Sequence, residues 1–206
     1  MEIDFSQVNP SQRYKLLASL VTPRPIAWVT TRDDLGRVNA APFSFFNVFG
    51  SDPALVAFAP GNKGKAQAGE PAIAKDTARN IRENGEFIIH LVPEELAQAM
   101  VQTAASLPAG VDEVQAAGLS TTAARTLQVP RIAEAPVALE CREHQTIEIG
   151  RNRLVIGVVN HVFVRDGLVE EETFHLRQKD WTPVGRMASP DWYCRSQDLF
   201  EMPRPA

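Results

Sequence analysis

The chain has 206 residues, of which 44% are hydrophobic and 22% charged, and its formal net charge is −4. This length suits a single domain with a sizeable core, and the scattered basic residues form no stripe that would indicate nucleic-acid binding. No apolar run approaches the roughly 18 residues of a membrane span, the polar first ten residues do not indicate a signal peptide, and two cysteines exclude a disulfide scaffold. We therefore expect a cytoplasmic protein that binds neither nucleic acid nor membrane.

The first half of the chain predicts one helix followed by short strands. Residues 11–20 have helical spacing, and Pro23 and Pro25 prevent that helix from continuing. Runs of apolar and β-branched residues, bounded by Gly, Pro and Asp, predict strands at 26–31, 55–58 and 87–92. A further helix is expected over 76–84, with Asp76 or Thr77 as its N-cap.

The second half continues this pattern and ends in an aromatic tail. Helices are predicted over 93–105 and 112–117, and strands over 137–141 and 154–164, the last of them either buried on both faces or bent near Gly157. Residues 177–206 contain Trp181, Trp192, Tyr193 and Phe200, so we expect this tail to dock on its own barrel or on a partner subunit. Short strands with few helices favour a mainly antiparallel barrel with peripheral helices, in one domain over 1–206.

The stretch Asn39-Ala40-Ala41-Pro42-Phe43-Ser44-Phe45-Phe46-Asn47 combines small residues, amide and hydroxyl groups, and three aromatic rings. A flat, hydrogen-bonding and partly apolar ligand needs such a lining, because the backbone can approach the ligand and ring faces can cover it. The alternative is an ordinary loop between two strands.

Two further motifs could bind an anion. Arg24 lies between two prolines in Thr22–Thr31, so a stiff segment presents its guanidinium. The segment Lys75–Asn80 begins a predicted helix, where free backbone N–H groups and basic side chains favour negative charge. The alternatives are a solvated arginine at a strand entry and an ordinary surface helix.

No catalytic constellation stands out in the sequence. The four histidines lack metal-ligand spacing, and His90, inside an apolar strand, is more typical of a core histidine whose hydrogen bonds are satisfied. There is no nucleophile elbow, Walker loop or dinucleotide fingerprint. We therefore predict no catalytic side chain and no metal, and expect a cofactor to perform any chemistry.

Several segments, taken in order, resemble a known family. TPRPIAWVTT, NAAPFSFFNVFGSDPALVAFAP, KDTARNI and GEFIIHLV, followed by PRIAEAPVALEC and LVIGVVNHVFV, resemble the flavin reductase-like family of FMN-binding split barrels, and within it flavoredoxin and related proteins. The resemblance covers about residues 12–170. It implies a six-stranded antiparallel Greek-key split barrel with peripheral helices, a homodimer, and FMN bound near the dimer interface.

The resemblance also implies a set of cofactor-binding residues. Asn39 to Ser44 would line the isoalloxazine ring and ribityl chain, Arg24, Lys75 and Thr77 would lie near the phosphate, and tail residues would close the site. The full set is Arg24, Thr30, Asn39, Ala40, Ala41, Pro42, Phe43, Ser44, Asn47, Lys75, Thr77, Asn80, Arg186 and Tyr193.

The function implied is that of an FMN-dependent oxidoreductase. Electrons would pass from NADH or NADPH through FMN to free flavin or another small-molecule redox acceptor. One alternative is an FMN-binding electron carrier without reductase turnover of its own. Another is a barrel that has lost flavin and serves as a structural or haem-binding dimer.

Overall fold

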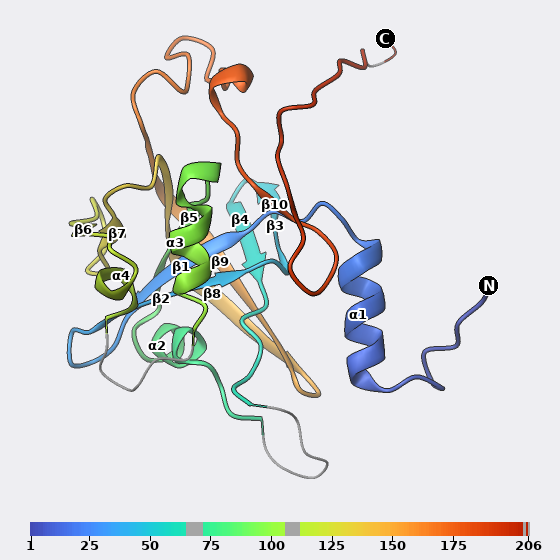
Figure 1. Ribbon diagram of the computed structural model, residues 1–206. Coiled ribbons are helices and arrows are strands. Elements are labelled where there is room, and N and C mark those ends of the chain that lie inside the picture. The colour runs from blue at the N-terminus through green and yellow to red at the C-terminus, as the bar shows by residue number, and fades with distance from the viewer. Residues whose placement is uncertain (65–71, 106–111, 204, 206) are drawn as a thin grey trace.

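The computed structural model describes residues 1–64, 72–105, 112–203 and 205 (Figure 1). Over these residues, the main sheet has seven antiparallel strands in the order β2-β1-β5-β8-β9-β4-β3. They are β1 (Ala27–Arg32), β2 (Val38–Phe43), β3 (Phe46–Ser51), β4 (Ala54–Phe58), β5 (Glu86–Leu91), β8 (Val137–Ile149) and β9 (Asn152–Val164). The predicted mainly β, antiparallel class is confirmed, but the sheet has seven strands and not the expected six.

The sheet curls so that its two edges approach each other. Strands β2 and β3 form opposite edges, yet only Ser44 and Phe45 separate them in the chain. Two residues span only a few ångströms, so the sheet must bend round to bring both edges to this turn. The ring centroids of Phe43 and Phe58 lie 5.4 Å apart inside the curl. The rest of this buried core is formed by Ala27, Val29, Val56, Ile81, Phe87, Ile89, Cys141 and Val155.

The strands of the main sheet that the sequence did not predict are β2, β3 and the far half of β8. Strand β2 contains Asn39 and Pro42, which are rare in strands, and a proline is tolerated there because β2 is an edge. The far half of β8, residues 142–149, is mostly polar and exposed and pairs with β9 in a long hairpin. Apolar runs therefore revealed the buried strands but not the edges.

Gly157 is required by packing in the middle of β9. A Cβ atom at this position would lie 2.4 Å from Cζ of the buried Phe87 ring. Only glycine therefore lets the ring fill the space beside β9. The pairing of β8 with β9 shifts register twice, with the extra residue Asn160 in β9 at the first shift and His144 in β8, next to the partner of Gly157, at the second.

The helices are α1 (Pro10–Leu20), α2 (Asp76–Asn84), the 3₁₀ turn η1 (Glu94–Leu96), α3 (Ala97–Gln102), α4 (Glu113–Ala116) and the 3₁₀ turn η2 (Gln178–Asp180). The bounds predicted for α2 are confirmed, and Gly85 ends it with a left-handed φ of 70°. Its N-cap is Lys75, so the prediction of Asp76 or Thr77 was wrong. The helix predicted over 93–105 begins as a 3₁₀ turn and ends at Gln102.

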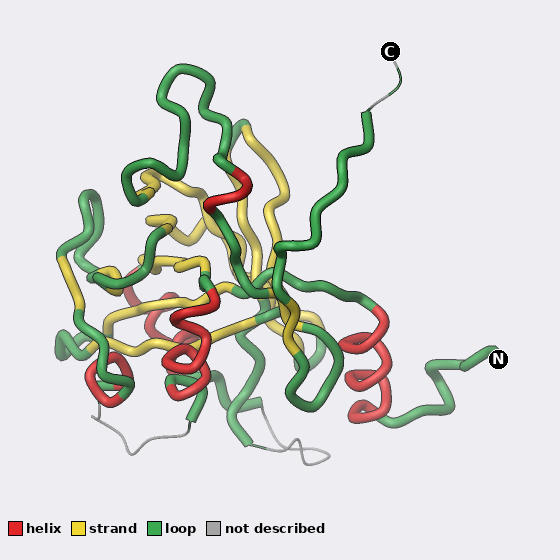
Figure 2. The backbone as a smooth tube through the Cα atoms, turned by 45° about the horizontal axis from the view of Figure 1, so that its top comes forward, coloured by secondary structure: helices red, strands yellow, loops and turns green. Residues whose placement is uncertain are grey.

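Helices α2, α3 and α4 lie together over β1 and β2, whereas α1 stands apart from the sheet (Figures 1 and 2). Trp28, Met100, Val114 and Ile132 form a second buried cluster under α3 and α4. The Trp28 indole donates a 2.9 Å hydrogen bond to Oγ1 of Thr103, which satisfies its polar end. None of the described helices is both long and apolar enough to cross a membrane.

Part of the aromatic tail docks on its own chain. Trp181 is buried against Val137 and Leu168. Strands β10 (Gly185–Arg186) and β11 (Tyr193–Cys194) pair with each other, while the short strands β6 (Thr121–Thr122) and β7 (Arg131–Ile132) form a separate pair. Trp192 and Phe200 remain exposed, so the two ends of the tail differ in how they are anchored.

Candidate functional site

Two neighbouring cavities lie beside β2 and the start of α2. The first, about 410 Å³, is lined by Tyr14, Phe43, Phe45 and Tyr193, and we call it the aromatic cavity. The second, about 380 Å³, is lined by residues of β2 and by the N-terminus of α2, and we call it the helix cavity. Lys75 lines both cavities, together with Asn62 and Ala104, so they form adjoining parts of one site.

The helix cavity presents a helix terminus without a side-chain cap. Lys75 is the N-cap residue of α2, and its side chain makes no capping hydrogen bond. The first N–H groups of a helix have no partner within the helix, and the helix dipole makes this end positive. A nine-residue helix that opens into a cavity in this way can bind an anionic group.

Lys75 adds a positive charge at the junction of the cavities. Burial lowers the pKa of its ammonium from the ordinary lysine value. Its Nζ lies 5.3 Å from the centroid of the Phe43 ring, and none of the described carboxylates forms an ion pair with it. A partly buried cation without a counter-ion is stabilised by an incoming anion, because the anion restores the interaction that burial removed.

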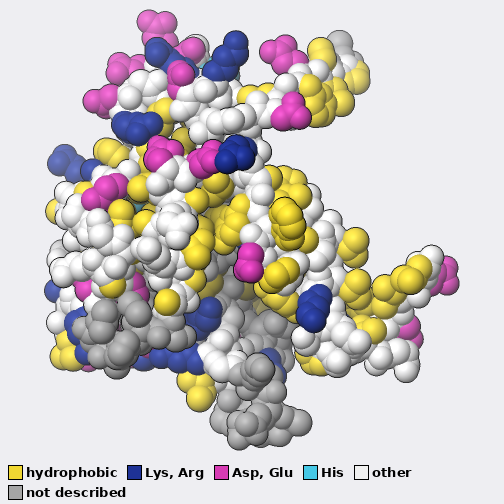
Figure 3. All heavy atoms as spheres, in the orientation of Figure 1, with side chains coloured by type: hydrophobic (Ala, Val, Ile, Leu, Met, Phe, Trp, Pro, Cys, Tyr) yellow, Lys and Arg dark blue, Asp and Glu magenta, His cyan; other side chains and the backbone are white. Residues whose placement is uncertain are grey.

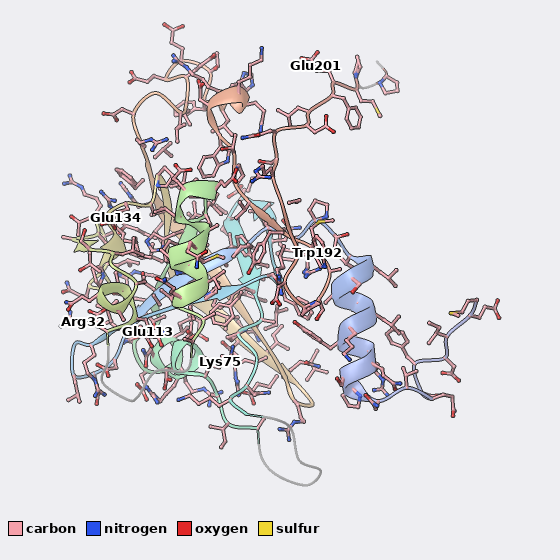
Figure 4. All side chains as sticks on the ribbon, viewed as in Figure 1. Arg32, Lys75, Glu113, Glu134, Trp192 and Glu201 are labelled. Atoms are coloured by element: carbon pink, nitrogen blue, oxygen red, sulfur yellow. The ribbon has the colours of Figure 1, made fainter. Side chains whose placement is uncertain are left out.

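Two carboxylates near the helix cavity differ in their pairing. Asp76 is held by Lys63 at 2.7 Å and by Arg79 at 2.7 Å, so its charge is neutralised. Glu113 lines the cavity, and burial raises the pKa of its carboxyl, with further increases from Asp112 and Asp76. Figure 4 places Lys75 and Glu113 below α3 and close to α2. Among the described lysines that line the helix cavity, Lys63 is paired with Asp76 and Lys75 remains available to a ligand, while Glu113 opposes anion binding when ionised.

Most of the predicted site residues line one cavity or the other. Pro42, Phe43, Ser44, Arg186 and Tyr193 line the aromatic cavity, Asn39, Ala40, Ala41 and Thr77 line the helix cavity, and Lys75 lines both. Asn39 Nδ2 donates to Thr77 Oγ1 over 3.0 Å, which ties β2 to the first turn of α2. Residues far apart in the sequence thus meet around one continuous space.

Four predicted residues line neither cavity, and each has contacts of its own. The Thr30 hydroxyl donates to the Pro130 carbonyl at 3.0 Å. Asn80 is buried and donates to Thr31 Oγ1 at 3.1 Å, which anchors α2 to the sheet. Asn47 is exposed, and its side chain accepts a hydrogen bond from the Val48 amide. The fourth, Arg24, directs its guanidinium to groups of the protein itself.

Sequence reasoning missed several residues of the aromatic cavity. They are Tyr14 of α1, the segment 59–62 after β4, Met100 and Ala104 near α3, and residues 151–153 of the β8–β9 hairpin. Arg153 Nη1 donates to Asn62 Oδ1 at 3.2 Å, and Asn62 Nδ2 donates to the Arg151 carbonyl at 2.7 Å. Nothing local in the sequence pairs these segments, because about ninety positions separate them.

The site therefore combines an anion-binding end with an aromatic end. A phosphate matches the N-terminus of α2 and the Lys75 ammonium, whereas a flat ring system matches Phe43, Phe45 and Tyr193. The guanidinium carbon of Arg186 lies 4.6 Å from the Tyr193 ring centroid, so the tail contributes a cation and a ring to the same wall. These residues fit a phosphorylated compound that carries a planar ring.

Comparisons with known proteins agree with this description. A family model described as Flavin reductase like domain matches residues 19–182. An uncharacterized protein of Deinococcus radiodurans is 44% identical over 206 residues, covering 98% of this chain and 88% of its own. The solved structure of Pseudomonas fluorescens 2-nitrobenzoate 2-nitroreductase NbaA is 33% identical, with a TM-score of 0.87 over 100% of this chain and 96% of that one. Nitrilotriacetate monooxygenase component B from Bacillus cereus is 31% identical, with a TM-score of 0.88 over 98% of each chain.

Proposed function

Since this chain belongs to the flavin reductase-like family, we propose that it binds FMN and acts as an oxidoreductase. Electrons would come from NADH or NADPH and pass to free flavin or another small acceptor. The observation that carries this proposal is the meeting of the two cavities at Lys75, with an uncapped helix terminus in one and aromatic side chains in the other.

Each end of the site has a separate task. The N–H groups of the first turn of α2 and the Lys75 ammonium would hold the phosphate by charge-assisted hydrogen bonds. Residues 39–44 would bring backbone and small side chains against the ribityl chain and the ring. Phe43 and Tyr193 would cover ring faces or edges and exclude water. Bound FMN would supply the electron transfer, for which these residues need provide only position and surrounding charge.

The visible spectrum of the purified protein, with and without added FMN, tests the binding proposal. Stopped-flow mixing of the FMN-loaded protein with NADH and NADPH then tests turnover, and rapid bleaching of bound flavin supports the oxidoreductase. Binding without bleaching would favour the electron-carrier alternative. Absence of flavin uptake at micromolar concentrations would reject both, and a Soret band would indicate haem.

The acceptor can be tested with two probes. Free flavin is one, and 2-nitrobenzoate is the other, since the nitroreductase named for it is 33% identical over the whole of this chain. Reoxidation of the reduced protein by one probe and not by the other would identify the class of acceptor.

We also propose that the protein forms a homodimer through the face made by β3 and α1. Val48 and Phe49 of edge strand β3 are 65% and 67% exposed, and Leu17 and Leu20 of α1 are also exposed. Figure 3 shows apolar side chains on the molecular face beside α1. An edge strand and a helix with uncovered apolar residues are typical of an interface. A second copy of the chain would cover both and would lie next to the aromatic cavity.

Substitution of Phe49 by aspartate is expected to convert the dimer to a monomer, because a buried, unpaired charge would oppose association. Size-exclusion chromatography with light scattering measures the change. Leu35→Asp is the matched control, since Leu35 is 72% exposed but lies in the turn between β1 and β2, away from the proposed face. An unchanged mass for Phe49→Asp, or a monomeric wild-type protein, would contradict the proposed interface.

A further inference from the structure

Arg24 is a buried arginine whose side chain makes several hydrogen bonds. It is only 7% exposed. Nη1 donates to the carbonyls of Ala18 and Val21, the latter over 2.6 Å, and Nη2 donates to the Met187 carbonyl over 3.0 Å. Nε points to Ser44 Oγ at 3.5 Å, the limit of a hydrogen bond. A planar guanidinium has five N–H donors in a fixed fork, and here four of them have partners.

These partners come from three separate parts of the chain. Ala18 and Val21 belong to the end of α1, Ser44 belongs to the turn between β2 and β3, and Met187 follows β10 in the tail. Arg24 therefore joins the exit of α1 and the curl of the sheet to the tail. Carbonyl groups cannot be ionised, so the charge of the guanidinium is solvated by aligned dipoles and not by a carboxylate.

The backbone strengthens the same junction. The Arg24 amide donates to the Arg186 carbonyl over 2.9 Å, and the Arg186 amide donates to the Arg24 carbonyl over 2.8 Å. The Arg186 side chain in turn donates to the carbonyls of Trp192 and Pro190 and stacks on Tyr193. The tail residues that line the aromatic cavity are thus held, directly or through one neighbour, by Arg24.

We propose that Arg24 is a positioning residue, which holds the tail so that Arg186 and Tyr193 face the ring of the bound flavin. The proposal rests on the proposed FMN function. It differs from a direct grip on the phosphate, because Arg24 lines neither cavity and four of its five N–H donors already have partners within the protein. A phosphate ligand would discriminate FMN from riboflavin, whereas a residue that positions the tail would affect both flavins equally.

The test measures the dissociation constants of FMN and riboflavin for Arg24→Met by fluorescence titration. Loss of the Arg24 hydrogen bonds is expected to weaken the binding of FMN and of riboflavin by the same factor, roughly tenfold. Limited trypsin digestion gives a readout that needs no flavin, since release of the tail exposes the bond after Arg186 and speeds its cleavage. Arg37→Met is the matched control, because Arg37 pairs with Asp33 in the β1–β2 turn.

Arg24→Lys separates geometry from charge. A lysine keeps the positive charge but cannot reproduce the fork, so it is expected to resemble Arg24→Met. Two results would overturn the proposal, because each would show that Arg24 acts on the phosphate. One is an Arg24→Lys variant that regains affinity for FMN but not for riboflavin. The other is an Arg24→Met variant that loses affinity for FMN alone.

Arg186→Ala keeps the proposal testable if the Arg24 variants fail to fold. It is expected to weaken the binding of both flavins. Combining it with Arg24→Met should weaken binding little further, because both residues act on the same wall of the aromatic cavity. Unchanged affinity for both flavins in Arg186→Ala would overturn the positioning role. A wild-type protein that binds no flavin would instead reject the proposed function itself.

Discussion

Replacement of Lys75 by methionine is expected to weaken FMN binding about tenfold to a hundredfold, while riboflavin affinity changes little. Methionine keeps most of the apolar stem beside Phe43 but removes the ammonium. A charge-assisted hydrogen bond to phosphate contributes on the order of 1.5–3 kcal/mol, and about 1.4 kcal/mol corresponds to a tenfold change. Riboflavin lacks the phosphate, so its binding reports only on the ring and ribityl contacts. Fluorescence titration with both flavins measures the difference.

Lys75→Arg serves as the charge-retaining control and should preserve most of the FMN preference. Because burial lowers the pKa of Lys75, its ammonium in the flavin-free protein loses its proton at a lower pH than an ordinary lysine. FMN affinity should therefore decline as the pH rises into the alkaline range, and this decline should be absent in Lys75→Met. Equal affinities of wild type and Lys75→Met for FMN would place the phosphate elsewhere.

Stability is expected to fall by about 3 kcal/mol as the pH drops from 6.5 to about 4, owing to His90. This buried ring donates from Nδ1 to the Trp28 carbonyl at 2.9 Å and accepts at Nε2 from the Ile132 amide at 3.0 Å. The bond accepted from Ile132 requires the neutral ring, because a proton on Nε2 would face another N–H. Burial, together with the charge of Arg131, lowers the pKa of His90 to about 4, although the hydrogen bond to the Trp28 carbonyl acts in the opposite direction.

The direction of this stability change follows from the pH at which the folded and the unfolded chain each bind the proton on His90. Between pH 6.5 and 4 the unfolded chain takes up the proton on His90 and the folded chain does not, so unfolding becomes easier as the pH falls. Urea unfolding at a series of pH values measures the slope. His90→Gln should be less stable at neutral pH but less sensitive to acid over this interval, and the exposed His175→Gln should behave as wild type. Parallel slopes for His90→Gln and wild type would contradict this assignment.

The buried parts of the fold could be predicted from the sequence because their signals are local. Strand β5 is apolar apart from Glu86 and His90, and α2 combines helical spacing with a following glycine, so both were placed to within about one residue. His90 was predicted to be a core histidine with satisfied hydrogen bonds, and the structure confirms both contacts. The edge strands were missed because an edge needs neither an unbroken apolar run nor strong β propensity.

The sequence by itself determined the family, the antiparallel class, and the segments 39–44 and 75–77 that line the cavities, because motif residues and their order are properties of the chain. Only the tertiary structure decided that Arg24 donates a hydrogen bond to the Met187 carbonyl, 163 positions away, and that Arg153 donates one to Asn62, 91 positions away. The physical reason is that such hydrogen bonds depend on how the sheet curls and where the tail returns. The curl of the sheet and the path of the tail depend on contacts between distant residues, which leave no periodic or local signal in the sequence.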